Sequence, residues 1–123
     1  MSFALAQYKT TSVDTASPIR LVVQLYDGAI RFMRVGQKAI VDGRIKARGE
    51  ALNRAHAIVG ELASTLDTSS APELCAELDR LYDYVLHQIT RAHMECEPEL
   101  LDPAIAVMAD LRGAWAELAK QQG

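Results

Sequence analysis

Residues 17–43 read SPIRLVVQLYDGAIRFMRVGQKAIVDG and have the boundaries and the periodicity of one long amphipathic helix. Ser17 is a favourable N-cap, and Pro18 suits the first helical position because the amide hydrogen that proline lacks has no helical partner there. Asp42-Gly43 is a typical helix end. Between these limits apolar residues recur at steps of three, four and seven and share one face: Val22, Tyr26, Ala29, Met33 and Ile40.

Three further segments repeat this helical pattern. Residues 44–66 form a heptad seam of Ile45, Leu52, Val59 and Leu66, with Ala55 and Leu62 interleaved. Residues 71–92 carry the stripe Leu74, Leu78, Leu81, Val85, Ile89 and Ala92. Residues 98–120 carry Leu101, Ala104, Met108, Leu111, Trp115 and Leu118.

Proline lies inside the last of these segments. Pro103 removes a backbone donor and clashes with the preceding turn if it stands in a helix interior. We therefore expect residues 98–101 to form a separate short turn, with Asp102 capping a new helix and Pro103 at its first position.

Short polar loops join the four helices, and no useful β-type alternation appears. The sequence thus predicts an all-α fold, an antiparallel up-down four-helix bundle over residues 17–120. Residues 1–16 show no periodicity, so we expect a mobile or extended N-terminal segment that is separate from the bundle.

Composition excludes several classes of function. The 123 residues suffice for one domain, and a net charge of −3 argues against nucleic acid as a partner. The charge is uneven, since residues 1–50 are basic on balance and residues 51–123 are acidic, which favours packing of the two halves. No apolar run is long enough to insert into a membrane, and Met1–Leu5 lacks the pattern of a secretory signal. Cys75 and Cys96 should lie too far apart to pair, as expected of a cytoplasmic protein.

Catalytic and metal-binding constellations are lacking. No phosphate-binding loop, metalloprotease motif or di-iron Glu-x-x-His motif occurs. His93 and Cys96 would supply half a metal site at best, and the predicted core stripes contain almost no charge. We therefore expect no enzymatic activity, no metal ion and no other cofactor.

The first helix carries more apolar surface than a bundle helix needs. One flank adds Ile19, Val23 and Ile30, and the other adds Leu21, Phe32, Val35 and Ala39, so that apolar residues cover about 240° of its circumference. Two candidates for the segment that covers this apolar surface remain: residues 1–16 and a segment of a partner protein. Gly28 and Gly36, inside the same helix, indicate either close approach of another chain segment or simple drift.

Several blocks of the sequence resemble the flagellar secretion chaperone family, FliS. Thr15-Ala16-Ser17-Pro18 followed by residues 25–32, LYDGAIRF, is similar to the family signature. Leu81-Tyr82-Asp83-Tyr84 and the blocks Leu111-Arg112 and Ala114-Trp115 match further family blocks in the same order, so that the resemblance extends over about residues 5–118.

The resemblance implies a four-helix bundle that binds the disordered C-terminal segment of flagellin and prevents its premature polymerisation in the cytoplasm. It also implies delivery of flagellin to the flagellar type III export apparatus, with Leu5 and Tyr8 at the spacing that docks on the export-gate protein. Together with the wide first helix, it predicts a flagellin-binding groove lined by Ile19, Leu21, Val23, Tyr26, Ile30 and Phe32.

Another class of function remains open on the same residues. The wide apolar surface of the first helix would also suit a different interaction module, such as a homodimeric bundle adaptor that buries this helix against a second copy.

Overall fold

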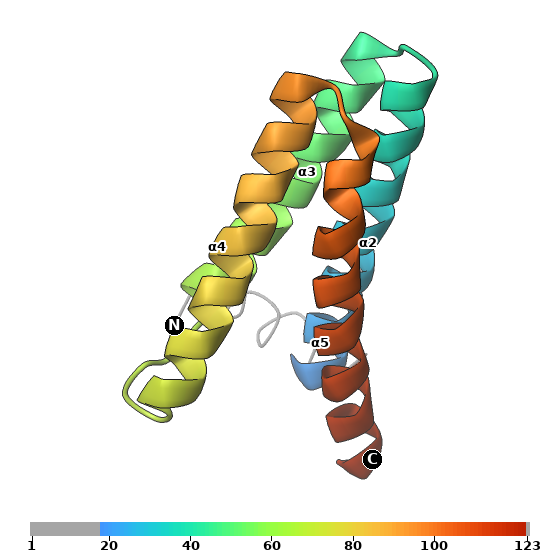
Figure 1. The fold of residues 1–123 in the computed structure, drawn as a ribbon. Helices are drawn as coiled ribbons and strands as arrows, with labels where there is room; N and C mark the ends of the chain where they lie inside the picture. The colour runs from blue at the N-terminus through green and yellow to red at the C-terminus, as the bar shows by residue number, and fades with distance from the viewer. Residues whose placement is uncertain (1–17, 123) are drawn as a thin grey trace.

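The computed structural model of the protein describes residues 18–122. Over that range the chain forms four long helices and one short 3₁₀ turn, and no strand: α2 Pro18–Val41, α3 Ile45–Ser64, α4 Pro72–Glu95, η1 Pro98–Leu100 and α5 Leu101–Gln121 (Figure 1). The all-α prediction is confirmed. Leu5, Tyr8 and the rest of residues 1–16 lie outside the described residues.

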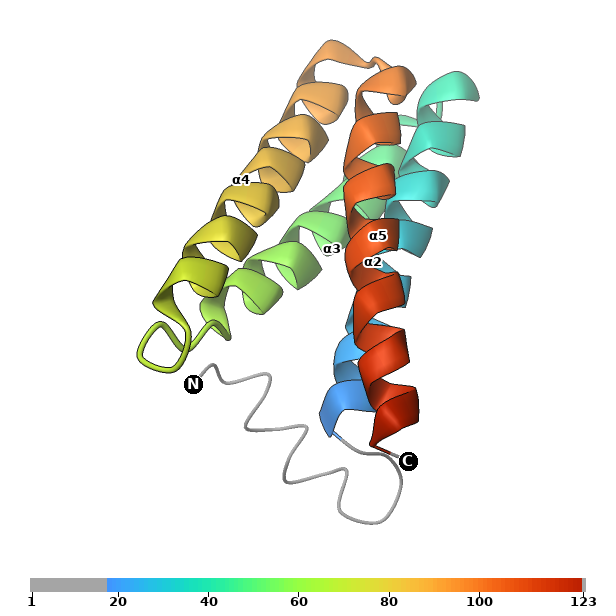
Figure 2. The same cartoon turned by 60° about the horizontal axis from the view of Figure 1, so that its bottom comes forward.

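The helices run antiparallel, each beside the next along the chain. α2 packs against α3 and α5, and α4 packs against the same two helices, so that α2 and α4 occupy opposite corners of the bundle. η1 joins α4 and α5 at one end, and the two helices diverge toward the other end (Figures 1 and 2). The face between α4 and α5 is therefore more open than the face between α2 and α3.

One apolar core runs through the bundle, and each helix supplies its predicted stripe to it. Its largest fully buried side chains are Tyr26, Met33, Leu52, Val59, Tyr82, Val85, Ile89, Leu101 and Met108. Burial of this kind contributes roughly 1.5–3 kcal/mol for each large side chain. The periodicity of the four segments thus identified the core correctly along most of each helix.

Three predicted core residues are wrong. Ile45, Leu74 and Leu118 are exposed over 71%, 60% and 38% of their surface. Ile45 begins α3, Leu74 lies in the first turn of α4, and Leu118 lies in the last turn of α5. The apolar period continues to these positions, but no neighbouring helix covers them. In α4 the thiol of Cys75 turns inward instead of Leu74 and donates to the carbonyl oxygen of Asp67 over 3.3 Å.

Close approach of a neighbouring helix explains one of the two glycines in α2. A Cβ atom on Gly36 would lie 2.3 Å from Cδ2 and 2.8 Å from Cγ of Leu52, which is itself buried. On Gly28 the nearest atom would be Cδ1 of Ile58 at 3.4 Å, an ordinary contact. Of these two glycines, only Gly36 is required by the close approach of α3.

Two glutamines hold η1 against the bundle. Gln88 is buried on α4, and its Nε2 donates to the carbonyl oxygen of Leu100 over 2.9 Å. Gln37 of α2 donates to the carbonyl of Pro98 over 3.1 Å and to Oδ1 of Asp102 over 2.7 Å. These bonds fix the reversal between α4 and α5 against α2 as well as α4.

The separate turn predicted around Pro98 is therefore present, with a correction to the start of α5. The helix begins at Leu101 and not after Asp102, whose carboxylate binds Gln37 and caps no helix. Pro103 stands third in α5, still within the first turn, where a missing amide hydrogen leaves no helical bond unmade.

Three ring systems form a polar contact inside the core. The hydroxyls of Tyr26 on α2 and Tyr82 on α4 share a hydrogen bond across the bundle, and Nε1 of Trp115 on α5 donates to the Tyr26 hydroxyl over 3.2 Å. Burial raises the pKa of Tyr26, although its hydrogen bonds to Tyr82 and Trp115 oppose the shift. Burial, and then the proximity of Tyr26, raise the pKa of Tyr82 more strongly. Both hydroxyls therefore stay protonated in the folded protein.

Both cysteines are free, as predicted. Cys96 ends α4 in the left-handed conformation, with φ 54°, and its Sγ accepts a hydrogen bond from Nη1 of Arg48 at 2.7 Å. None of the helices that the structure describes is long and apolar enough to span a membrane.

Substitution of Gly36 tests the close contact between α2 and α3. We expect Gly36→Ala to lower the free energy of unfolding by about 1–2 kcal/mol, because overpacking against Leu52 exceeds the gain in helix propensity. Gly113→Ala is the matched control, since nothing lies within 4 Å of its added Cβ, and it should stabilise by about 0.5–1 kcal/mol. Urea unfolding measures both, and equal stabilisation by the two substitutions would refute the close contact.

The tyrosine pair predicts a loss of stability in alkaline solution. In an unfolded chain the tyrosines ionise near their ordinary pKa of 10.0, whereas burial raises the pKa of both hydroxyls in the folded protein. Their contribution to stability is therefore complete below pH ~10 and declines as the pH rises above it. We expect Tyr82→Phe to cost about 1–2 kcal/mol at neutral pH and to reduce this alkaline decline. A wild-type and variant pair with parallel stability profiles between neutral and alkaline pH would contradict the assignment.

Candidate partner-binding surface

The two apolar flanks of α2 face different neighbours. Val23, on one flank, lies opposite α5, and the same side of α2 carries Asp27, which pairs with Arg112 of α5 at 2.8 Å. Phe32, on the other flank, lies beside Arg54 of α3. The wide apolar surface of α2 is thus divided between two helix contacts, and it does not form one continuous groove.

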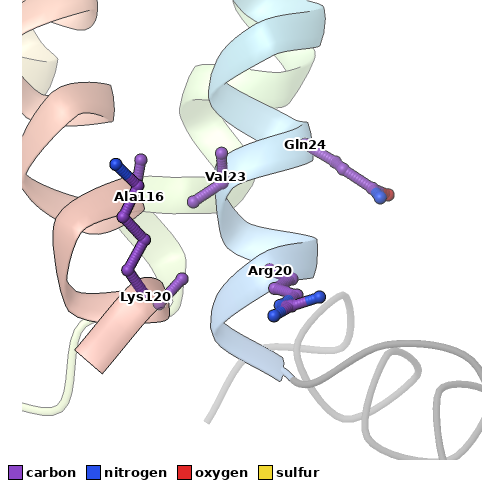
Figure 3. A pocket seen from close by; sticks show the side chains of 6 residues that line it. Arg20, Val23, Gln24, Ala116 and Lys120 are labelled. Atoms are coloured by element: carbon purple, nitrogen blue, oxygen red, sulfur yellow. The ribbon is translucent and has the colours of Figure 1, made fainter. Parts of the chain in front are cut away.

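A shallow cleft remains between the beginning of α2 and the end of α5. Its volume is about 290 Å³, and its lining is Arg20, Val23, Gln24, Ala116, Ala119 and Lys120. In Figure 3 Val23 points toward α5 and Ala116, whereas the end of the Gln24 side chain points away from α5. Small alanines on α5 leave the methyl groups of Val23 incompletely covered, so this end of α2 offers apolar contact area with a basic edge.

On the α3 side, Phe32 is half-buried and lies between two guanidinium groups. The Cζ atoms of Arg31 and Arg54 are 5.1 and 5.5 Å from the centroid of its ring. Both distances are within the range of cation–π attraction. The two arginines therefore hold the ring at the surface. A partner segment can contact only the part of the ring that they leave exposed.

Of the six residues predicted to line a groove, five remain partly exposed on α2, and one, Tyr26, does not. Tyr26 is fully buried, because its hydroxyl is bonded inside the core, so it supports the surface from below and does not line it. The other five are half-buried and retain part of their apolar surface: Ile19, Leu21, Val23, Ile30 and Phe32.

A second apolar surface was missed by the sequence analysis, which had assigned several of its residues to the core. Leu74, Leu81 and Tyr84 lie seven and three residues apart on one side of α4, and Gln88, four residues further on, binds the carbonyl of Leu100. That side of α4 thus faces toward α5. Tyr84, like Leu74, is exposed to solvent, over 41% of its surface.

α5 contributes the other half of this surface. Arg112 and Ala116 turn toward α2, and Val107, Leu111 and Leu118 lie on the flank away from them, toward α4. We define the α4–α5 face as Leu74, Leu81, Tyr84, Val107, Leu111 and Leu118. Because α4 and α5 diverge along it (Figure 2), its apolar side chains remain partly or largely exposed. An unexpected exposure of large apolar residues of this kind is typical of a protein-binding surface.

These surfaces offer apolar contact area. No group of three or more His, Cys, Asp or Glu side chains within residues 18–122 is arranged to hold a metal ion. Burial raises the pKa of both hydroxyls of the tyrosine pair, but this pair is sealed from solvent. The arrangement suits the binding of apolar segments.

Comparison with known proteins gives a consistent family. The family model described as flagellar protein FliS matches residues 1–122. The flagellar secretion chaperone FliS of Vibrio cholerae is 34% identical, over 96% of this chain and 90% of its own length. The protein of the same name from Bacillus subtilis is 31% identical, over 89% of this chain and 81% of its own.

A solved structure, described as a flagellar chaperone from bacteria, has the same fold. The two superpose with a TM-score of 0.79 over 96% of each chain, at 22% sequence identity. Fold, family model and named relatives agree, and the relatives are chaperones rather than enzymes. This chain belongs to the FliS family of flagellar secretion chaperones.

Proposed function

We propose that the protein binds the disordered C-terminal segment of flagellin in the cytoplasm, prevents its premature polymerisation and delivers it to the flagellar type III export apparatus. The observation that carries this proposal is the apolar surface that the bundle leaves uncovered on a chain of the FliS family. That surface comprises the half-buried flanks of α2 and the α4–α5 face.

The energetics suit a segment that has no structure of its own. Burial of about 600 Å² of apolar surface would contribute roughly 15 kcal/mol before costs, at ~25 cal/mol per Å². Ordering of a disordered ligand consumes much of this gain. The difference between the two sets the affinity, which the proposed function requires to be high enough to mask flagellin and low enough for release at the export apparatus.

The partner segment should contact more than one side of the bundle. Ile19, Val23 and Ile30 lie on the α5 side of α2, and Leu21 and Phe32 lie on its α3 side. The α4–α5 face lies beyond α5. A segment that follows these surfaces in turn must wrap around the bundle, which an extended chain with short helical turns can do.

The proposed mechanism is the masking of apolar side chains on flagellin. Apolar side chains of flagellin that would pack against other subunits in a filament are covered by apolar side chains of the chaperone instead. No covalent step or cofactor is involved. The N-terminal segment, through Leu5 and Tyr8, is proposed to dock the complex on the export-gate protein.

Polar substitutions at exposed apolar positions test the proposed surface. We expect Leu74→Gln and Val23→Gln each to weaken binding of a flagellin C-terminal peptide at least about fivefold, because each replaces apolar contact area with a group that must be desolvated. Ile45→Gln is the matched control: it is as exposed as Leu74 but lies off the proposed surface, and it should change the affinity less than about twofold. Isothermal titration calorimetry measures all three.

Absence of binding at micromolar concentrations, or equal weakening by Ile45→Gln, would contradict the proposal. Light scattering on the same samples separates the alternative of a homodimeric adaptor. A stable dimer that ignores the flagellin peptide would favour that alternative.

A further inference from the structure

A cleft with a basic rim lies between α2 and α3, near the turn that joins them. Its volume is about 290 Å³. Three basic residues border it, and three small apolar residues form its floor: Arg34, Lys38 and Arg44, and Val35, Ala39 and Ala47. We call this site the basic cleft. It lies beyond Leu21 and Phe32 on the same flank of α2, and none of the residues proposed above to contact flagellin lines it.

The positive charge of the basic cleft is largely uncompensated. Within residues 18–122 the guanidinium groups of Arg34 and Arg44 make no ion pair or side-chain hydrogen bond. Lys38 pairs with Asp42, which also lines the cleft, at 3.2 Å, and this exposed pair contributes little. The cleft therefore presents a net charge of about +2 to a ligand.

A neighbouring cleft on the other side of α2 differs from the basic cleft in its net charge. It shares Arg34 and Lys38 but also contains the carboxylates of Glu99 and Asp102, neither of which forms an ion pair with Arg34 or Lys38. The charge asymmetry is thus specific to the side of α2 that faces α3, and it is not a general property of that end of the bundle.

The floor of the basic cleft is apolar and small. Val35 is 47% exposed, and Ala39 and Ala47 leave room beside it. No aromatic side chain lines the cleft, so it offers no stacking platform for a nucleic-acid base. A bare phosphate or sulfate would pair with the arginines but would leave the exposed valine uncovered. The geometry fits an apolar side chain that is flanked by carboxylates.

We propose that the basic cleft is a docking site for an acidic amphipathic helix of a partner protein. A leucine-sized side chain of the partner packs on Val35, Ala39 and Ala47. Carboxylates one helical turn before and after it pair with Arg34 and Arg44. This inference rests on charge complementarity and on the exposed floor, and it stands or falls independently of flagellin binding.

A synthetic peptide provides the probe. It is a labelled helical peptide that carries one leucine with glutamates one turn before and one turn after it. A second peptide has glutamines in place of the glutamates. We expect saturable binding of the acidic peptide to the full chain, with affinity that decreases as salt is raised, and at least about tenfold weaker binding of the glutamine peptide.

Charge reversal locates the contact. Arg34→Glu with Arg44→Glu should weaken binding of the acidic peptide at least about tenfold. The control, Arg80→Glu with Arg91→Glu, changes the net charge equally on α4, at the cost of two exposed ion pairs only, and should leave the affinity within about twofold. Fluorescence anisotropy measures affinity, and far-ultraviolet circular dichroism verifies that both variants fold.

Several outcomes would overturn the proposal. They are absence of saturable peptide binding, equal weakening by the α4 control, and tighter occupation of the cleft by anionic phosphatidylglycerol vesicles or by a DNA oligonucleotide. A dimer of the free protein that Arg44→Glu alone converts to monomer would also overturn it, because the occupant would then be a second copy of the chain. Normal flagellin binding by the cleft variant would separate failure here from failure of the proposed function.

Discussion

The packing of α2 between α3 and α5 is the constraint on which the rest of the bundle depends. Gly36 lets Leu52 of α3 approach the backbone of α2, and Tyr26 joins α2 to Tyr82 and Trp115 on the two other helices. Glutamines from α2 and α4 then fix the turn before α5. α2 packs against both α3 and α5, whereas α4 and α5 lie close to each other near η1 and diverge beyond it (Figure 1).

This arrangement leaves apolar surface where a chaperone needs it. The α4–α5 face cannot be covered by α2, which lies at the opposite corner from α4. Leu74, Tyr84 and Leu118 consequently remain exposed, while the hydrogen bond between the buried hydroxyls of Tyr26 and Tyr82 links α2 to α4 inside the core. Stable packing and an available binding surface thus arise from the same choice of neighbours. A bundle with four equal interfaces would bury these residues and could offer little to a partner.

Much of the fold could be predicted from the sequence, because its signals are local. Asp42-Gly43 correctly ends α2 after Val41, and the 3.6-residue period identifies most of the core, whereas the predicted cap Ser17 lies outside the described residues. Periodicity does not tell where a neighbouring helix ends, which is why Ile45, Leu74 and Leu118 were assigned to the core. Tyr26 was assigned to a surface because its partners, Tyr82 and Trp115, are 56 and 89 residues away in the chain.

The proposed binding surface was harder to predict, since it depends on the divergence of two helices, and no single helix encodes that divergence. The most direct test is to follow the methyl resonances of the full chain by NMR during titration with a flagellin C-terminal peptide. We expect the methyl groups of Val23, Leu74 and Leu118 to shift, with those of the control positions Val41 and Ile45 unchanged. Shifts confined to Val41 and Ile45, or no shifts at saturating peptide, would contradict the assignment of the uncovered apolar surface to flagellin.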